Sequence, residues 1–332
     1  MGKIVEIAKI LVSPAEKLID VIRAAIGKAY EPRYEKRMSD AKAYEITTVA
    51  NALRDSSDIP ITYSKEGLTM STTDFDEFKK RTQSRLAYQE LTKQKNIESV
   101  ADYAYAQLEG AADVPNDPVD QDWINRFFNS VADVSNEDMQ LLWGKILAGE
   151  VKQPGSFSLR TLETLRNMSK KDAELFVKIA PFLVSITSDS QKVLSSDDEL
   201  CEKYGLSYGK IIMILDECGL INSSAFLTFN LSLTKEQEIP VYTLERVALL
   251  RGLNDNSVKI SFGVHTLTKV GLELFNLIDA KPNNEYFSDF IKNIESANKG
   301  KVVATIHSVN TIQNGGINYK KEPIEIIKSD NK

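Results

Sequence analysis

The chain has few residues of the types that carry the common catalytic and metal-binding chemistries. Its 332 residues include two cysteines, Cys201 and Cys218, and two histidines, His265 and His307. Two cysteines are too few for a disulfide framework and are typical of a reduced cytosol. The cysteines form no CxxC pair and have no histidine at metal-ligand spacing, so we expect no metal and no cofactor. Because no histidine or cysteine completes a nucleophile–base pair, the sequence favours a protein that is not an enzyme.

Phosphate-binding loops and long apolar runs are missing as well. No GxxxxGK[ST] loop occurs, and no charge-free run approaches the ~20 residues of a solitary transmembrane helix. The N-terminus has no signal-peptide cleavage site. The net charge of -6 argues against a protein coated in basic surface for nucleic acid, although a local basic pocket is compatible with it.

The densest pattern in the chain lies at residues 122–158. Two apolar faces at helical spacing, joined by a short turn, predict a compact helical hairpin. Asp120 or Gln121 begins the first helix, Ser135 with Asp138 is the expected capping box of the second, and Pro154 follows the end of the hairpin. The inward residues are Trp123, Ile124, Phe127, Phe128, Val131, Met139, Leu142, Trp143, Ile146 and Leu147.

Glu150 in this stretch has two interpretations. It could be the carboxylate of a ligand-binding or hydrolytic site, or it could join ion pairs and cap contacts with residues such as Arg126 and Arg160. The second is the more common arrangement, since structural networks also hold charged groups.

The N-terminal residues predict an amphipathic helix. Ser13, Pro14 and Glu16 have the order of an N-cap, a first helical position and a capping acid. The apolar face is broad, and Glu16, Asp20 and Arg23 share the narrow polar face. Three interpretations of residues 1–30 remain open: a buried domain or coiled-coil helix, an interfacial membrane helix, and an oligomerising helix that inserts. In the third, Asp20 lines a pore, and Glu16 and Arg23 lie beside it as pore or gating residues.

A basic cluster follows directly. Arg33, Lys36 and Arg37 are typical of a contact with an anionic membrane surface or ligand, although Glu31 and Glu35 dilute the charge and a solvated helix face is the alternative. A long polar helix is then expected from Thr73 or Asp74 to about Ala111, with an inner side of apolar residues that includes Phe78 and Leu86. Its basic residues face an anionic ligand or solvent: Lys79, Lys80, Arg81, Arg85, Lys93 and Lys95.

The pattern changes after residue 190. A helix, a turn, a helix ending in ECGLI, strand-like runs and the LT..G..L segment at 267–278 resemble a winged helix. We therefore expect a mainly α fold, with a helical N-terminal and central bundle and a smaller α+β winged-helix-like C-terminal domain. The expected parts are amphipathic N-terminal helices at 1–30, long polar helices at 31–112, a central helical domain at 113–190 and the winged-helix-like domain at 191–328.

Three runs together resemble an uncharacterised bacterial family, domain of unknown function 2806. They are AIGKAYEPRYEKR with its continuation (25–46), KQKNIESV (93–100), and above all PVDQDWINRFFNSVADVSNEDMQLLWGKILAGEVKQPGSFSLRTLE (118–163). The resemblance covers about the first half to two-thirds of the chain and implies no activity.

The overall plan is also similar to the membrane effector of Hailong-type anti-phage, abortive-infection systems. That resemblance implies a channel-like homo-oligomer, a tetramer, at the bacterial inner membrane with a cytoplasmic body. An inhibitory nucleotide or short single-stranded DNA oligomer, made by a partner nucleotidyltransferase, would restrain it, and its release would depolarise the cell. The alternative function is a soluble winged-helix regulator that binds DNA or a partner protein.

Overall fold

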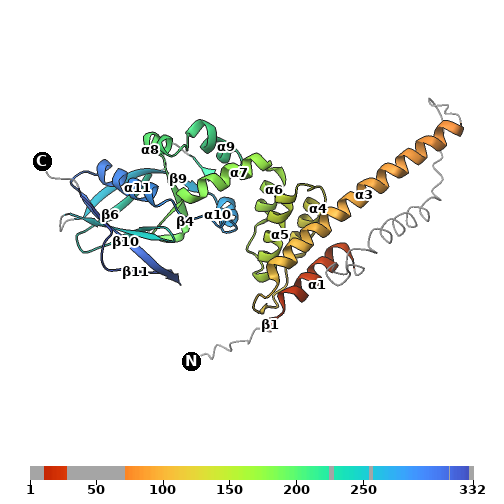
Figure 1. The fold of residues 1–332 in the computed structure, drawn as a ribbon, viewed down its shortest axis with the longest axis horizontal. Coiled ribbons are helices and arrows are strands. Elements are labelled where there is room, and N and C mark those ends of the chain that lie inside the picture. The colour runs from red at the N-terminus through yellow and green to blue at the C-terminus, as the bar shows by residue number, and fades with distance from the viewer. Residues whose placement is uncertain (1–10, 28–71, 224–227, 254–256, 314, 329–332) are drawn as a thin grey trace. The chain divides into compact units, whose positions relative to one another are not determined.

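The computed structural model describes residues 11–27, 72–223, 228–253, 257–313 and 315–328 (Figure 1). The chain divides into two compact units, one up to Leu162 and the other from Glu163 onward. Arg33, Lys36 and Arg37 lie outside the described residues.

The N-terminal unit is helical, apart from one short two-stranded sheet. Its elements are β1 (Leu11–Val12), α1 (Pro14–Ile26), α3 (Thr72–Leu108), β2 (Val114–Pro115), α4 (Gln121–Val131), α5 (Glu137–Lys152) and the start of α6 (Leu159–Asn167). β1 and β2 pair in the antiparallel direction, with Leu11 opposite Pro115 and Val12 opposite Val114.

The predicted hairpin of α4 and α5 forms the centre of this unit. The Asp120 side chain caps α4, and the Asn136 side chain, one residue after the expected Ser135, caps α5. Phe127 and Trp143 are fully buried and meet edge to face at 5.3 Å. Aromatic pairs in this geometry contribute about 0.5–1.5 kcal/mol beyond their burial. The facing sides of the two helices therefore form a packed aromatic core.

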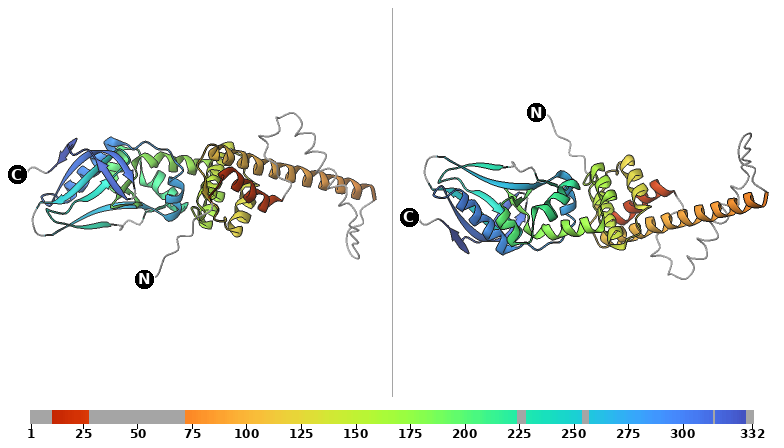
Figure 2. Two further views of the ribbon diagram at one scale, coloured as in Figure 1. Left: turned by 90° about the horizontal axis from the view of Figure 1, so that it is seen from below. Right: turned by 90° about the horizontal axis from the view of Figure 1, so that it is seen from above.

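The long helix α3 packs on α5 through its second half only. A Cβ atom on Gly144 would lie 2.6 Å from Tyr103 Cβ, so the absence of a side chain at this position lets the two helices approach closely. Within residues 77–108 of α3, the buried side chains begin at Asn96, and Phe78 and Leu86 are exposed. The first half of α3 extends beyond the other helices of the unit in every view (Figures 1 and 2). Phe78 and Leu86 are thus not the inward residues that their spacing predicts.

The C-terminal unit combines short helices with one large sheet. Its helices are α7 (Lys170–Ile179), a 3-10 turn (Ala180–Phe182), α8 (Asp198–Lys203), a π-helical turn (Tyr208–Ile212) leading into α9 (Met213–Glu217), α10 (Lys269–Phe275) and α11 (Asn284–Ala297). Its strands are β3 (Val184–Ile186), β4 (Ser188–Ser195), β5 (Ile221–Asn222), β6 (Thr228–Leu233), β7 (Ile239–Tyr242), β8 (Arg246–Gly252), β9 (Val258–Leu267), β10 (Val302–Gln313), β11 (Gly316–Tyr319) and β12 (Glu325–Ile327).

These ten strands form one antiparallel sheet. The order is β11-β10-β8-β7-β3-β4-β9-β5, with β12 on β10 and β6 on β9. Helix α11 packs on the sheet through Tyr286, Phe287, Phe290, Ile291 and Ile294, all of which are buried as their spacing predicts. The Tyr286 hydroxyl accepts a hydrogen bond from the Ser195 backbone N–H at 2.9 Å, which joins α11 to the end of β4.

The expected fold class, mainly α with a smaller winged-helix-like domain at 191–328, is wrong. The second helix, the strands and the LT..G..L helix exist, but the strands belong to the ten-stranded sheet and form no short wing. β4 pairs with β9 and β10 pairs with β8. These strands are separated by long stretches of chain, and local patterns do not show which distant strands will pair.

Candidate functional site

Helix α1 presents the predicted pore or gating residues on its solvent-facing side. Glu16, Asp20 and Arg23 are all exposed. Leu18, Val21 and Ile22 on the other side are buried, and α1 contacts α3, α4 and α5. The structure thus brings the three charged residues together and buries the apolar face of α1 in the helical unit. Of the three interpretations of this helix, the packing agrees with a buried domain helix.

Two polar connections join α1 to the segment before α4. The first is the β1–β2 pairing. The second is a hydrogen bond of 2.9 Å from the Lys17 ammonium to the backbone carbonyl of Pro115, and Lys17 is only 6% exposed. Gly27 ends the helix at a φ of 96°. Among the described residues, no helix has the length and apolar character that crossing a membrane requires.

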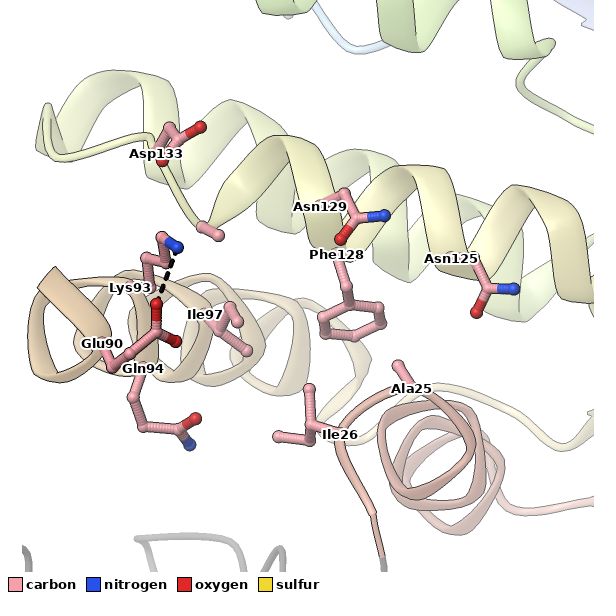
Figure 3. Close-up of a pocket in the computed structure, with 11 residues that line it drawn as sticks. Ala25, Ile26, Glu90, Lys93, Gln94, Ile97, Asn125, Phe128, Asn129 and Asp133 are labelled. Carbon is pink, nitrogen blue, oxygen red and sulfur yellow. Dashed lines mark hydrogen bonds and ion pairs between the residues drawn. The ribbon is translucent and has the colours of Figure 1, made fainter. Parts of the chain in front are cut away.

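The last turn of α1 forms one wall of a pocket of about 550 Å³ (Figure 3). Helix α3 and the C-terminal half of α4 form the other walls. This volume lies within the roughly 300–1,000 Å³ of typical small-molecule sites. The lining residues are Ala25, Ile26, Glu90, Lys93, Gln94, Ile97, Asn125, Phe128, Asn129, Ala132 and Asp133.

The pocket combines an apolar base with amide and charged groups. Phe128, Ile97 and Ile26 lie close together in Figure 3, and Gln94, Asn125 and Asn129 supply three side-chain amides. Lys93 is bound to Glu90 at 2.8 Å. This hydrogen bond, with the nearby charges of Glu90 and Asp133, raises the pKa of Lys93. Among the described lining residues, two carboxylates, Glu90 and Asp133, stand against one lysine, so this part of the wall carries a net negative charge.

A second candidate surface lies on the exposed half of α3. Arg81, Tyr88 and Lys95 recur every seven residues and therefore share one side of the helix. Tyr88 is 72% exposed. Arg85 lies one turn after Arg81 and donates to the Gln89 side chain at 3.2 Å, while Arg81 pairs with Glu77 at 3.7 Å. An exposed aromatic ring among cations is typical of contacts with anionic, base-containing ligands.

A comparison with protein-family models assigns the chain to a family. Residues 80–291, almost two-thirds of the chain, match the model described as protein of unknown function, DUF2806. The chain belongs to the DUF2806 family. The match runs from α3 to α11, so α1 and strands β10–β12 lie outside it. No curated protein and no solved structure matches this DUF2806 chain.

Glu150 of the DUF2806 chain has a structural role. It is 1% exposed, and its carboxylate accepts hydrogen bonds from the backbone N–H groups of Gly155 at 2.6 Å and Phe157 at 3.0 Å. The Trp123 indole N–H donates to the Phe157 carbonyl at 2.8 Å in the same loop. Glu150 therefore fixes the loop between α5 and α6, and its carboxylate is directed at backbone donors.

Cys201 and His307 of the DUF2806 chain are held by contacts with neighbouring backbone. Burial raises the pKa of the Cys201 thiol to about 12, and Cys201 donates to the Ser195 carbonyl. A thiol with this pKa is inert at neutral pH. His265 is on β9, whereas His307 is on β10 and is bound to the Lys320 carbonyl and Thr305. Within the described ranges, no three histidine, cysteine or acidic side chains gather as metal ligands would.

The sequence gives little indication of the pocket. Asn125 and Asn129 are one turn apart on the polar face of α4, which predicts only that they lie on the same side. The sequence predicts that Lys93 is one of six basic residues along a long helix. Nothing in its spacing distinguishes Lys93 from the other five. The pocket forms because α1, α3 and α4 meet, and this requires the tertiary fold.

Proposed function

We propose that this DUF2806 protein is a non-enzymatic, ligand-controlled effector of bacterial anti-phage defence that acts at the inner membrane through its N-terminal residues. The proposal takes the homo-oligomer, a tetramer, from the effector resemblance. The observation that carries it is the burial of the apolar face of α1 while Glu16, Asp20 and Arg23 face solvent. In this proposal, the docked α1 is the restrained form of the protein.

The energetics of docking are compatible with a switch. Full burial of one valine, leucine or isoleucine side chain contributes about 1.5–3 kcal/mol, so Leu18, Val21 and Ile22 together hold α1 with several kcal/mol. Transfer of the same side chains into a bilayer would recover a similar free energy. A ligand that binds only the docked form can therefore decide between the two states, because it shifts the equilibrium by its difference in affinity.

The released form would need more than α1 to enter a membrane. Thirteen helical residues span about 20 Å, whereas the hydrocarbon core of a bilayer is about 30 Å thick. In the proposal, the apolar-rich residues 3–12 enter together with α1. Copies of Asp20 then face a shared, water-filled axis, with Glu16 and Arg23 on the same side, since an acid in a membrane needs a polar partner or water.

The restraining ligand of the proposal is a nucleotide or a short single-stranded DNA oligomer from a partner nucleotidyltransferase. The exposed side of α3 with Arg81, Tyr88 and Lys95 supports contact with such an anionic ligand. Arg33, Lys36 and Arg37 remain predicted contacts with the ligand or the membrane surface.

A disulfide that locks α1 in place tests the proposal directly. Val12 and Val114 are direct partners in the antiparallel β1–β2 pair. Cα atoms in such pairs are about 4.5–5.5 Å apart, within the range that a disulfide spans. The purified double variant Val12→Cys/Val114→Cys should release dye from vesicles of phosphatidylglycerol and phosphatidylethanolamine when reduced, and should release none when oxidised.

The single variant Val12→Cys is the matched control and should release dye under both conditions. In cells, expression of the full chain should depolarise the inner membrane, and deletion of residues 1–30 should abolish this effect. Equal leakage from the locked and reduced forms, or depolarisation without residues 1–30, would contradict the proposal.

A second candidate function rests on the same side of α3: a soluble regulator that binds nucleic acid through Arg81, Arg85, Tyr88 and Lys95. Such binding should weaken steeply with salt, because each neutralised phosphate releases counterions. Salt-dependent binding of single-stranded DNA that Arg81→Gln and Tyr88→Ala weaken, with no vesicle leakage under any condition, would favour this candidate.

A further inference from the structure

We propose that α3 joins copies of this chain head to tail. The basic stretch of α3, residues 77–95, docks on the acidic segment, residues 109–122, of a second copy, beside Leu11 of that copy. The inference supplies a contact for the homo-oligomer of the proposed function and rests on it in that respect. The contact itself is argued from the charges and the exposed side chains of the two surfaces.

The basic stretch has a charge opposite to that of the chain as a whole. Residues 77–95 contain six lysines and arginines and two acids, whereas the whole chain carries a net charge of -6. Glu77 pairs with Arg81 at 3.7 Å, and Glu90 pairs with Lys93 at 2.8 Å, so both acids of the stretch already have a cation beside them. The other four cations of the stretch are all exposed: Lys79, Lys80, Arg85 and Lys95.

Apolar side chains share this surface with the cations. Phe78, Arg85 and Leu86 fall within an arc of about 100° around the helix axis. Phe78 is 52% exposed and Leu86 is 42% exposed. Asp74 and Asp76 at the start of the helix reduce the excess of cations and do not reverse it. Because two such stretches would place like charges opposite each other, their charges oppose a symmetric pairing of α3 with α3 and favour an acidic partner surface.

The acidic segment lies at the other end of α3. Residues 109–122 contain five acids and no lysine or arginine. The five acids are all exposed: Glu109, Asp113, Asp117, Asp120 and Asp122. Leu11, which is 59% exposed, lies opposite Pro115 in the β1–β2 pair and gives this surface an apolar side chain. Lys152 donates to the Gln107 carbonyl at 3.3 Å and borders the segment.

The two surfaces cannot meet within one copy. At about 1.5 Å per residue, about 35 Å of α3 separates Leu86 from Glu109. Figures 1 and 2 show α3 as one continuous helix, with β1 near its C-terminal end. Complementary charges therefore act between copies, where they steer the encounter and fix the orientation.

This contact determines the kind of assembly that forms. Each copy carries both surfaces, so the contact is heterologous, and repeated contacts either close into a ring or continue as a filament. A closed ring of four copies is the tetramer of the proposed function.

An exchange of charges between two variants of the full chain tests the contact. The first variant reverses three exposed cations of the basic stretch: Lys79→Glu/Lys80→Glu/Arg85→Glu. The second variant reverses three exposed acids of the acidic segment: Glu109→Lys/Asp113→Lys/Asp122→Lys. Each variant alone then has like charges on both surfaces, so sedimentation equilibrium should show association at least about tenfold weaker than that of the wild type. An equal mixture restores opposite charges at every contact and should reach the mass of the wild-type oligomer.

Two further measurements complete the test. A variant with three exposed lysines of the C-terminal unit reversed, Lys171→Glu/Lys299→Glu/Lys321→Glu, has the same change in net charge as the first variant and should associate like the wild type. The wild-type oligomer should dissociate as the salt concentration rises from about 0.1 M to about 1 M, because the Debye length falls from about 10 Å to about 3 Å.

Three results would overturn the contact. The first is a wild-type chain that stays monomeric at every concentration, and the second is a mixture that associates no better than the separate variants. The third is an oligomer with the same mass in the wild type and both triple variants, which would leave the homo-oligomer of the proposed function in place with another interface. If the first variant instead lost binding to single-stranded DNA or to anionic vesicles at unchanged mass, the basic stretch would be a nucleic-acid or lipid surface. Failure of the vesicle experiment on α1 would overturn the membrane action alone, since the charge exchange does not depend on it.

Discussion

The Lys17 ammonium donates a 2.9 Å hydrogen bond to the Pro115 carbonyl, which joins α1 to a segment 98 positions later in the chain. The lysine is almost fully buried, and the β1–β2 pairing lies directly beside this bond. The contact therefore connects the N-terminal helix to the segment that leads into the central hairpin.

Lys17→Met should loosen α1 without unfolding the helical unit. Hydrogen bonds to charged groups contribute about 1.5–3 kcal/mol, so amide exchange in residues 14–26 should accelerate about tenfold or more. Mass spectrometry of those peptides measures the effect. Lys178→Met, which removes an exposed lysine–carbonyl bond to Gly205 in the other unit, is the matched control and should leave the exchange of α1 unchanged. Unchanged exchange in Lys17→Met would show that the apolar contacts alone hold the helix.

Glu150→Gln should lower stability and leave any activity of the folded protein intact. The amide replaces one of two oxygens that accept backbone N–H groups, so one buried donor loses its acceptor at a cost of about 1–3 kcal/mol. Urea denaturation measures the loss, and Glu137→Gln, an exposed change on the same helix, should have little effect. A variant with wild-type stability and no biological activity would instead return Glu150 to the list of catalytic candidates.

Gly271→Ala should destabilise the C-terminal unit. An added Cβ would overlap the Leu220 carbonyl oxygen, which is backbone and cannot rotate away. Overpacking of this kind typically costs about 1–3 kcal/mol. Gly209→Ala is the matched control, because a Cβ at this position would meet open space. Thermal unfolding should give a lower melting temperature for Gly271→Ala than for Gly209→Ala. Equal melting temperatures in the two variants would mean that α10 shifts freely on the sheet.

His265 should make the stability of the protein depend on pH near neutrality. Burial lowers its pKa below the usual 6.5, against the opposing charges of Asp198 and Asp216. The unfolded chain therefore binds a proton at a higher pH than the folded chain does. Stability should be complete above pH 6.5 and should fall as the pH drops through that value toward the lower folded pKa.

The urea midpoint at pH 7.5 and pH 5.5 measures this contribution. The difference between the two midpoints should be smaller in His265→Gln than in the wild type. An equal difference in both proteins would assign the pH dependence to other groups.

Local sequence patterns correctly predicted the helices whose start and packed face lie within a few residues of each other. Asp120 caps α4, and the aromatic face of the hairpin is buried. The predicted cap of α5 was one residue early because Ser135 and Asn136 are adjacent and both can cap a helix, and the structure uses Asn136.

The sheet required information that short patterns do not contain. β4 and β9 have strand-compatible sequences, but nothing within either shows that Val193 lies opposite Thr266. The same limit explains Phe78 and Leu86 on α3, because a periodic apolar face predicts burial only where a partner helix is present.

The sequence by itself determined the helical hairpin, the amphipathic character of α1 and the scarcity of nucleophilic and metal-binding side chains. These properties follow from residue types and from spacings within one element. Only the tertiary structure decided that the apolar face of α1 is buried, that Glu150 binds backbone donors, and that Ile26, Lys93 and Asn129 line one pocket. Each of these results depends on contacts between residues far apart in the chain, and such contacts form only when the whole unit packs.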